Sequence, residues 1–229
     1  MSNKYKLIES NKPGLFRIKA LRSFGDVTKG DVGGYVESEK NLSQESNAWV
    51  YGDARVYDEA WVGGDARVHG EAQVGGVARV YDDAQVGGNA RVGGDVRVYG
   101  EAWVGGDARV YGDAWVGGKA RVHGEAWVGG DARVYGDARV YGDARVGGEA
   151  QVFGKDIVTT TPWTFQLTQH QITVTDNHVN IGCEQHSLDY WLKNYDKIGE
   201  KYHYPPKDIQ LYGDLIKSIY VYKNKTEEK

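Results

Sequence analysis

The side chains best suited to chemistry in this sequence are arginines that recur at a fixed spacing. Arg79 precedes Arg97 by eighteen residues, and Arg91 precedes Arg109 by the same interval. If the chain returns to the same place every eighteen residues, the members of each pair lie about 4.8 Å apart on neighbouring strands. Two adjacent guanidinium groups present an array of N–H donors that carboxylate or phosphate oxygens match well. The spacing therefore favours a site for an anionic partner.

Nearby acidic residues offer an alternative interpretation of these pairs. Asp83 and Asp95 stand where a corner of the chain is expected, and their carboxylates could neutralise the stacked arginines. Tyr81 and Tyr99 flank the first pair at the same eighteen-residue interval. Both interpretations, a neutralised ladder and an open anion-binding site, are compatible with the sequence.

Every tryptophan of the same region has an arginine eighteen residues away. The resulting neighbours are Trp49 with Arg67, Trp61 with Arg79, Trp103 with Arg121, Trp115 with Arg97 and Arg133, and Trp127 with Arg109 and Arg145. We expect cation–π contacts worth about 0.5–1 kcal/mol each at the surface. These residues form either a ladder satisfied within the chain or an interface, since Trp and Arg are enriched at binding hot spots. The predicted binding residues are Arg79, Arg97, Arg91, Arg109, Tyr81, Tyr99, Trp61, Trp103, Trp115 and Trp127.

Catalytic and metal chemistry is less well supported. His69 and His123 are separated by three intervals of eighteen residues, so both belong to one outward column. His178, Cys183 and His186 provide three potential zinc ligands, whereas a structural zinc site normally has four. We instead expect Cys183 to be buried, and we predict no catalytic residue, metal or cofactor.

The element that positions all these side chains is a six-residue repeat. Residues 48–155 form eighteen uninterrupted units, with Val third in every unit and Ala first in every unit except the one that begins at Val96. A period this short is too small for helical repeats and indicates a β-helix. Val points inward, its neighbours point outward, and Gly-Asp forms the corner. Three units make one triangular coil, so we predict six coils spanning about 29 Å.

The unit Val-x-Gly-Asp-Ala-x resembles the hexapeptide repeat of left-handed parallel β-helix proteins, a group that includes trimeric acyltransferases. The left hand is an implication of that resemblance. So is an alternative function, a hexapeptide-type acyltransferase that uses an acyl-CoA. The resembled enzymes need a general-base histidine and loops that form a cleft, whereas these coils contain no inserted loop.

The segments on either side of the coils are predicted to be caps. Residues 1–47 are predicted to contain a β-hairpin and an irregular first coil. In residues 156–229, apolar residues alternate in some stretches and recur at helical spacing in others, which predicts a small α+β cap with two helices. The last seven residues, 223–229, are expected to fray. Residues 18–43 and 172–191 resemble the leading and C-terminal segments of β-helix proteins encoded by bacteria and their prophages, most of which lack an assigned activity.

The overall composition sets further limits. The 229 residues have a formal net charge of −4, which does not favour nucleic-acid binding. One cysteine and no apolar leader predict a cytoplasmic protein, and no stretch is apolar enough for a membrane span. We therefore expect a mainly β, non-enzymatic binding protein of phage or prophage origin that acts in the host cytoplasm. Its expected partners are itself, as a homo-oligomer, with a trimer implied by the resemblance, and a host protein with an acidic surface.

Overall fold

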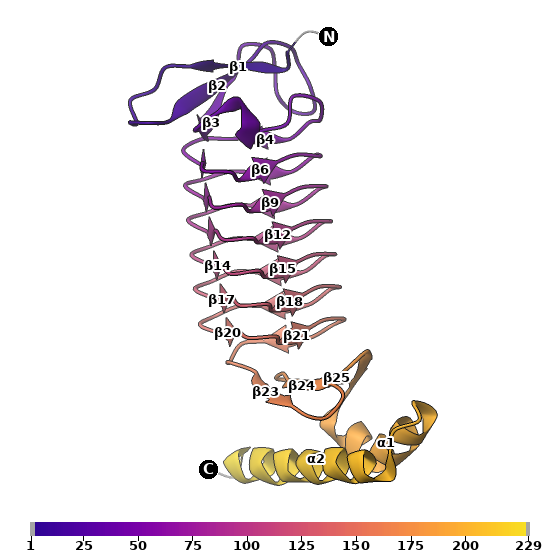
Figure 1. Cartoon of the computed structure of the whole chain (residues 1–229). Coiled ribbons are helices and arrows are strands. Elements are labelled where there is room, and N and C mark those ends of the chain that lie inside the picture. The colour runs from indigo at the N-terminus through magenta and orange to yellow at the C-terminus, as the bar shows by residue number, and fades with distance from the viewer. Residues whose placement is uncertain (1–2, 228–229) are drawn as a thin grey trace. The chain divides into compact units, whose positions relative to one another are not determined.

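The computed structural model describes residues 3–227, with side chains to residue 223. Contacts divide the chain into two compact units, unit 1 (Met1–Thr161) and unit 2 (Pro162–Lys229). Unit 1 is a parallel β-solenoid with short strands on three faces (Figure 1). The mainly β fold predicted from the repeat is confirmed. The left hand remains an expectation from the resemblance.

Three sheets run along the solenoid. Sheet I contains β1 (Tyr5–Ile8), β2 (Phe16–Ala20), β3 (Val32–Val36), β5 (Arg55–Val56), β8 (Gln73–Val74), β11 (Arg91–Val92), β14 (Arg109–Val110), β17 (Trp127–Val128) and β20 (Arg145–Val146). Sheet II contains β4 (Trp49–Val50), β7 (Arg67–Val68), β10 (Gln85–Val86), β13 (Trp103–Val104), β16 (Arg121–Val122), β19 (Arg139–Val140) and β22 (Ile157–Val158). Sheet III contains β6 (Trp61–Val62), β9 (Arg79–Val80), β12 (Arg97–Val98), β15 (Trp115–Val116), β18 (Arg133–Val134) and β21 (Gln151–Val152).

The interior of the solenoid is a column of small apolar side chains. The repeat valines and alanines are buried, and Val96 occupies the place of an alanine without becoming exposed. Each coil is hydrogen-bonded to the next one, for example from Arg79 N to Val96 O at 2.8 Å and from Arg97 N to Ala114 O at 3.0 Å. The inward register of the repeat is therefore as predicted from the sequence.

The corners of the coils require a left-handed backbone conformation. Glycine adopts positive φ at most corners, and Asp58 and Asp82 take its place with φ of 57°. Each of these two carboxylates accepts a hydrogen bond from the corner glycine eighteen residues later, Gly76 N at 2.9 Å and Gly100 N at 3.1 Å. The extra bond offsets part of the strain of a non-glycine residue in this region.

The solenoid extends beyond both ends of the predicted repeat. At the N-terminus, β1 and β2 form the expected antiparallel hairpin, and β3 passes from antiparallel pairing with β2 to parallel pairing with β5. A 3-10 helix (Glu39–Asn41) follows, and Leu42 forms a parallel bridge with Val62. At the other end, Ile157 and Val158 pair with β19, so that sheet II has seven strands.

The N-terminal cap buries a lysine against the first coils. Lys4 is fully buried and its Nζ donates to the carbonyl oxygens of Ser46 at 2.9 Å and Ala48 at 2.8 Å. Burial, with a further contribution from Arg22, lowers the pKa of Lys4 to about 8. The cap thus satisfies carbonyl groups that the end of the solenoid leaves without a coil to pair with.

Unit 2 is a small α+β unit with its own core. Its antiparallel sheet contains β23 (Trp163–Gln166), β24 (Gln171–Val174), β25 (Val179–Ile181) and β26 (Glu184–His186), followed by helices α1 (Leu188–Lys201) and α2 (Pro206–Glu227). Ser187 is the N-cap of α1, where its side chain accepts a hydrogen bond from Tyr190 N. The expected fraying from Lys223 is wrong for residues 223–227, which continue α2; residues 228–229 lie outside the described chain.

Candidate binding surface

The predicted binding residues fall on all three faces of the solenoid. Sheet III holds Arg79 and Arg97 together with Trp61 and Trp115, and Tyr81 and Tyr99 directly follow its strands β9 and β12. Sheet I holds Arg91, Arg109 and Trp127, and sheet II holds Trp103. The structure therefore brings six of the ten residues to one face or its rim, which we call the sheet III surface (Trp61, Arg79, Tyr81, Arg97, Tyr99 and Trp115).

Four side chains of the sheet III surface, Tyr81, Tyr99, Trp115 and Arg97, contact one another in a row. Arg97 and Arg79 are register partners on adjacent strands. The rings of Tyr81 and Tyr99 stack with centroids 5.7 Å apart and planes 12° apart, and Tyr99 meets Trp115 edge-on at 6.5 Å. The guanidinium carbon of Arg97 lies 4.8 Å from the centre of the Trp115 ring. Stacking of this kind holds the guanidinium plane in a defined orientation.

No carboxylate in the described part of the chain forms an ion pair with the four predicted binding arginines. Within residues 3–223, no carboxylate oxygen lies within 4.0 Å of a guanidinium nitrogen of Arg79, Arg97, Arg91 or Arg109. Asp83 and Asp95 therefore do not form ion pairs with them, contrary to the alternative interpretation.

The corner residue two positions before each arginine helps to explain why these ion pairs do not form. Most repeat arginines follow an acidic residue by two positions, but Arg79 follows Val77, Arg91 follows Asn89 and Arg121 follows Lys119. Val77 is 42% exposed, which is unusual for a valine in this repeat. Because apolar and amide side chains replace carboxylates before Arg79 and Arg91, the positive charge of these two arginines is less compensated locally. The difference is visible only when the corner residues of successive repeats are compared with one another.

Sheets III and I carry the same outward sequence along the axis. In sheet III the order from β9 to β18 is Arg79, Arg97, Trp115, Arg133, and in sheet I the order from β11 to β20 is Arg91, Arg109, Trp127, Arg145. Sheet II differs, since a third arginine pair, Arg121 with Arg139, follows Trp103. All three faces thus carry an arginine pair, and sheets III and I share the order in which a tryptophan follows the pair.

The tryptophans are less exposed than the sequence suggested. Among the described residues, Trp115 alone makes the expected cation–π contacts, with Arg97 at 4.8 Å and Arg133 at 5.2 Å. The indoles of the other three predicted residues instead fold over the glycines two positions later: Trp61 over Gly63, Trp103 over Gly105 and Trp127 over Gly129. Trp61 is 38% exposed, and the other three are half-buried.

Trp49, a further repeat tryptophan, is 2% exposed and packs edge-on against Tyr5 and Phe24 of the N-terminal cap. The expectation that all five repeat tryptophans are exposed and stacked on arginine is therefore wrong. Trp115 also has a glycine two positions later, Gly117, but the ring of Tyr99 covers that glycine, and the Trp115 indole lies between arginines instead.

The histidines of the coils are engaged in stacking. His123 lies between Trp103, at 5.5 Å, and Tyr141, at 5.3 Å with planes 8° apart. His69 lies over Gly87, where a side chain would collide with its ring. Both therefore belong to the outward aromatic column, as their spacing predicted.

Unit 2 contains a polar cluster that the sequence did not indicate. The Glu184 carboxylate accepts hydrogen bonds from Tyr202 Oη at 2.7 Å and Lys201 Nζ at 3.0 Å, and it pairs with His186 Nε2 at 2.8 Å. These contacts, that from Tyr202 first, lower the pKa of Glu184 to about 2. The cluster joins β26 to the end of α1, which sequence spacing alone does not reveal.

The cysteine of unit 2 is exposed, not buried as expected, and its Sγ lies 3.7 Å from Tyr202 Oη. It follows Gly182 in the turn between β25 and β26, so that its side chain lies outside the sheet's packed face. No group of three or more His, Cys, Asp or Glu side chains within the described chain is placed to hold a metal ion.

Comparisons with known proteins support the solenoid. Residues 48–64, 84–100, 90–106, 102–118 and 132–148 match the family model described as the YdcK beta solenoid repeat. No curated protein matches the chain. Neither helix in the described part of the chain has the length and hydropathy of a membrane span. The fold and the repeat together define a β-solenoid protein with an arginine pair on each of its three faces.

Proposed function

We propose that this protein is a non-enzymatic binding protein that captures an acidic partner surface on its sheet III surface. The observation that carries the proposal is the Arg79–Arg97 pair, which no carboxylate of the described residues neutralises and which stacked aromatic rings border. The Arg97 guanidinium, held against the Trp115 ring, provides oriented donors with little left to lose in conformational entropy. Sheet I repeats the ladder through Arg91 and Arg109 and extends the surface.

The proposal includes the biological setting that the resemblance implies. We place the protein among hexapeptide-type β-helix proteins of phage or prophage origin, acting in the host cytoplasm on a host enzyme or defence complex. Self-association is part of the proposal, because flat solenoid faces that carry aromatic side chains tend to pack together. The resemblance supports a trimer.

Site-specific photo-cross-linking tests which face contacts the partner. A benzoylphenylalanine that replaces Val77 would lie beside Arg79 of sheet III, and one that replaces Asp137 would lie beside Arg139 of sheet II. Both positions are exposed corners. In bacterial lysate we expect a discrete cross-linked partner from position 77 and a much weaker product from position 137. Equal products from the two positions, or a product from position 137 alone, would contradict the assignment of the face.

A further inference from the structure

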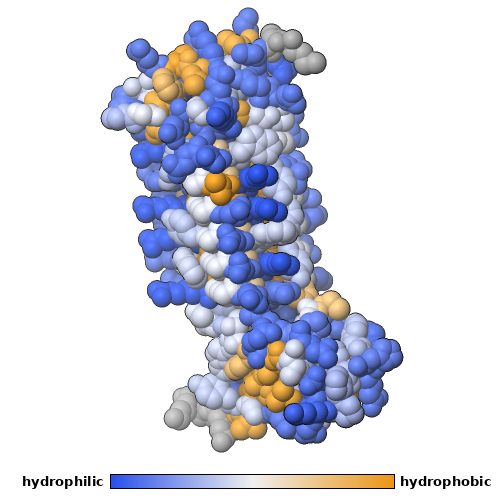
Figure 2. Space-filling model, in the orientation of Figure 1, coloured by the Kyte–Doolittle hydropathy of each residue, from blue (hydrophilic) through white to orange (hydrophobic). Residues whose placement is uncertain are grey.

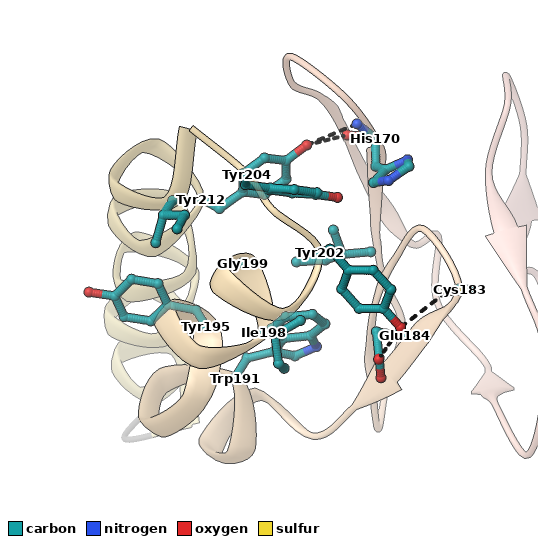
Figure 3. Close-up of a pocket in the computed structure, with 12 residues that line it drawn as sticks. His170, Cys183, Glu184, Trp191, Tyr195, Ile198, Gly199, Tyr202, Tyr204 and Tyr212 are labelled. Carbon is teal, nitrogen blue, oxygen red and sulfur yellow. Dashed lines mark hydrogen bonds between the residues drawn. The ribbon is translucent and has the colours of Figure 1, made fainter. Parts of the chain in front are cut away.

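Unit 2 contains a hollow with aromatic walls where the C-terminal end of α1, the start of α2 and the β25–β26 hairpin meet (Figure 3). Its enclosed space is small, about 40 Å³, so it suits only a compact group. The aromatic side chains that line it are Trp191, Tyr195, Tyr202, Tyr204 and Tyr212. In Figure 3, Tyr204 and Trp191 lie on opposite sides of the hollow, and Tyr202 stands beside Glu184.

Hydrogen bonds hold two of these walls in place. Trp191 Nε1 donates to the carbonyl oxygen of Val179 at 2.7 Å, which locks the indole against the sheet. The Tyr212 hydroxyl accepts a hydrogen bond from the backbone N–H of His170 at 2.9 Å. The ring of Tyr204 packs between His170 and Tyr212, with its centroid 5.9 Å from the first ring and 5.6 Å from the second. The hollow is therefore largely preorganised, which lowers the entropy lost when a ligand binds.

One carboxylate lines the hollow, and Lys201 at the rim forms an ion pair with it. Glu184 is the one carboxylate among the lining residues, and these include no Lys or Arg. Its low pKa, about 2, keeps it ionised at neutral pH. A carboxylate offers about four acceptor positions, and Tyr202, Lys201 and His186 use three of them. One position remains for a donor or a cation from the ligand.

The rim of the hollow already accommodates a cation. Lys201 Nζ lies 4.7 Å from the centre of the Tyr202 ring and 3.0 Å from Glu184 Oε1, although the Lys201 side chain is 63% exposed. An aromatic face next to a carboxylate attracts ammonium groups, and the attraction is stronger where water is excluded. An ammonium group therefore lies between an aromatic face and a carboxylate at the rim, and we expect the deeper aromatic walls to favour the same kind of group.

We infer that this hollow binds a small organic cation whose nitrogen carries methyl groups, with Trp191, Tyr202 and Tyr204 facing the methyl groups and Glu184 as the counter-ion. A methylated ammonium spreads its charge over an apolar surface, so aromatic walls can replace its weak hydration. A simple anion does not fit a lining whose one charged group is a carboxylate, and the lining residues His170, Cys183 and Glu184 are not placed together to hold a metal ion. The inference concerns unit 2 alone and does not depend on the binding proposed for the solenoid.

The test uses the full-length chain labelled with ¹⁵N at tryptophan, in which the Trp191 indole N–H resonance, assigned with Trp191→Phe, reports on the hollow. Choline is the probe, and 3,3-dimethyl-1-butanol, its uncharged isostere, is the comparison. Glu184→Gln removes the counter-ion, and Glu200→Gln, an exposed carboxylate of α1 outside the lining, is the matched control. Tyr204→Leu removes one aromatic wall and preserves an apolar one.

We expect choline to shift the Trp191 resonance saturably and to bind about tenfold more tightly than its isostere. Glu184→Gln and Tyr204→Leu should each weaken choline binding about tenfold or more, whereas Glu200→Gln should leave it unchanged. A dispersed Trp191 resonance in each variant confirms that the unit is folded. Absence of a shift with choline in the wild type, equal affinity for the isostere, or full affinity in folded Glu184→Gln would overturn the inference.

Discussion

Arg97 lies over the indole of Trp115 in the next coil, with its guanidinium carbon 4.8 Å from the ring centre, and Arg133 covers the same indole from the following coil at 5.2 Å. The tryptophan thus separates two guanidinium groups that would otherwise stand in adjacent rungs. On its other side, Arg97 has Arg79 as its register partner. The two neighbours of Arg97 therefore have opposite effects, since one stabilises its charge and the other repels it.

Replacement of Trp115 should reveal this difference. Trp115→Leu removes the cation–π contacts of both arginines and should lower the free energy of unfolding by about 1–2 kcal/mol, whereas Trp61→Leu should cost less because no cation–π contact is seen at Trp61. Chemical denaturation of the two variants provides the comparison. Equal losses would show that the arginine stack on Trp115 contributes nothing measurable.

The inward valines should be intolerant of charge. Val104→Asp places an unpaired carboxylate in a dry column of apolar side chains and should cost more than about 4 kcal/mol, enough to disrupt the coils. Gln85→Asp, at an exposed outward position of the neighbouring strand in sheet II, is the control and should melt within a few degrees of the wild type. Circular dichroism melting curves measure both. A Val104→Asp variant as stable as the wild type would show that the inward register is wrong.

The repeat made the coils predictable to the level of register. Because the eighteen-residue period has no interruption, every predicted neighbour, such as Arg79 with Arg97, is found on adjacent strands. Side-chain orientation was not predictable in the same way. The direction of the Trp103 indole depends on Gly105, two residues later, and not on Arg121 in the next coil.

Unit 2 has no repeat to fix its contacts. Periodicity identified its two helices and two of its strands, but β26 and the contact of Glu184 with Tyr202 result from tertiary packing between segments eighteen residues apart. Cys183 was placed incorrectly for the same reason, since its exposure depends on how the hairpin meets α1. Figure 2 shows the corresponding difference in surface character, with hydrophilic residues covering much of the coils and hydrophobic residues gathered on part of unit 2.

The Glu184 cluster predicts an acid-sensitive contribution to the stability of unit 2. The pKa of Glu184 falls from an ordinary value of 4.5 to about 2 in the folded chain, so the ionised form is favoured by folding. Its contribution is fully present above about pH 4.5 and is lost as the pH falls towards 2. The unfolding free energies of wild type and Glu184→Gln should therefore differ at pH 6 and converge by pH 2, as measured by urea denaturation. Parallel pH curves would contradict the assignment.

Self-association is a separate expectation. Flat solenoid faces with half-exposed aromatic side chains should produce a homo-oligomer at micromolar concentration. Light scattering coupled to size exclusion measures the mass. A particle of 25.4 kDa, the mass of one chain, at high concentration would rule out this part of the proposal.

A coenzyme-binding assay separates the binding protein from the acyltransferase alternative. The coils between residues 48 and 155 have no inserted loop, His123 is stacked on its neighbours and His69 lies over Gly87, so we expect acetyl coenzyme A to leave the melting temperature unchanged. A ligand that binds only the native state must raise the melting temperature. A concentration-dependent increase with acetyl coenzyme A would favour the transferase.

Partner capture by an arginine-depleted variant tests the proposed anion-binding role. Arg79, Arg97, Arg91 and Arg109 are all changed to Gln, a residue that the repeat already contains at Gln73 and Gln85, and Arg121→Gln with Arg139→Gln serves as the control on sheet II. Pull-down from host lysate is quantified at low and moderate salt for the wild type and both variants. We predict that the quadruple variant keeps its melting temperature, captures several-fold less partner and loses most of the salt dependence, while the control resembles the wild type. Equal capture by the wild type and the quadruple variant at both salt concentrations would contradict the assignment of these arginines as the binding determinants.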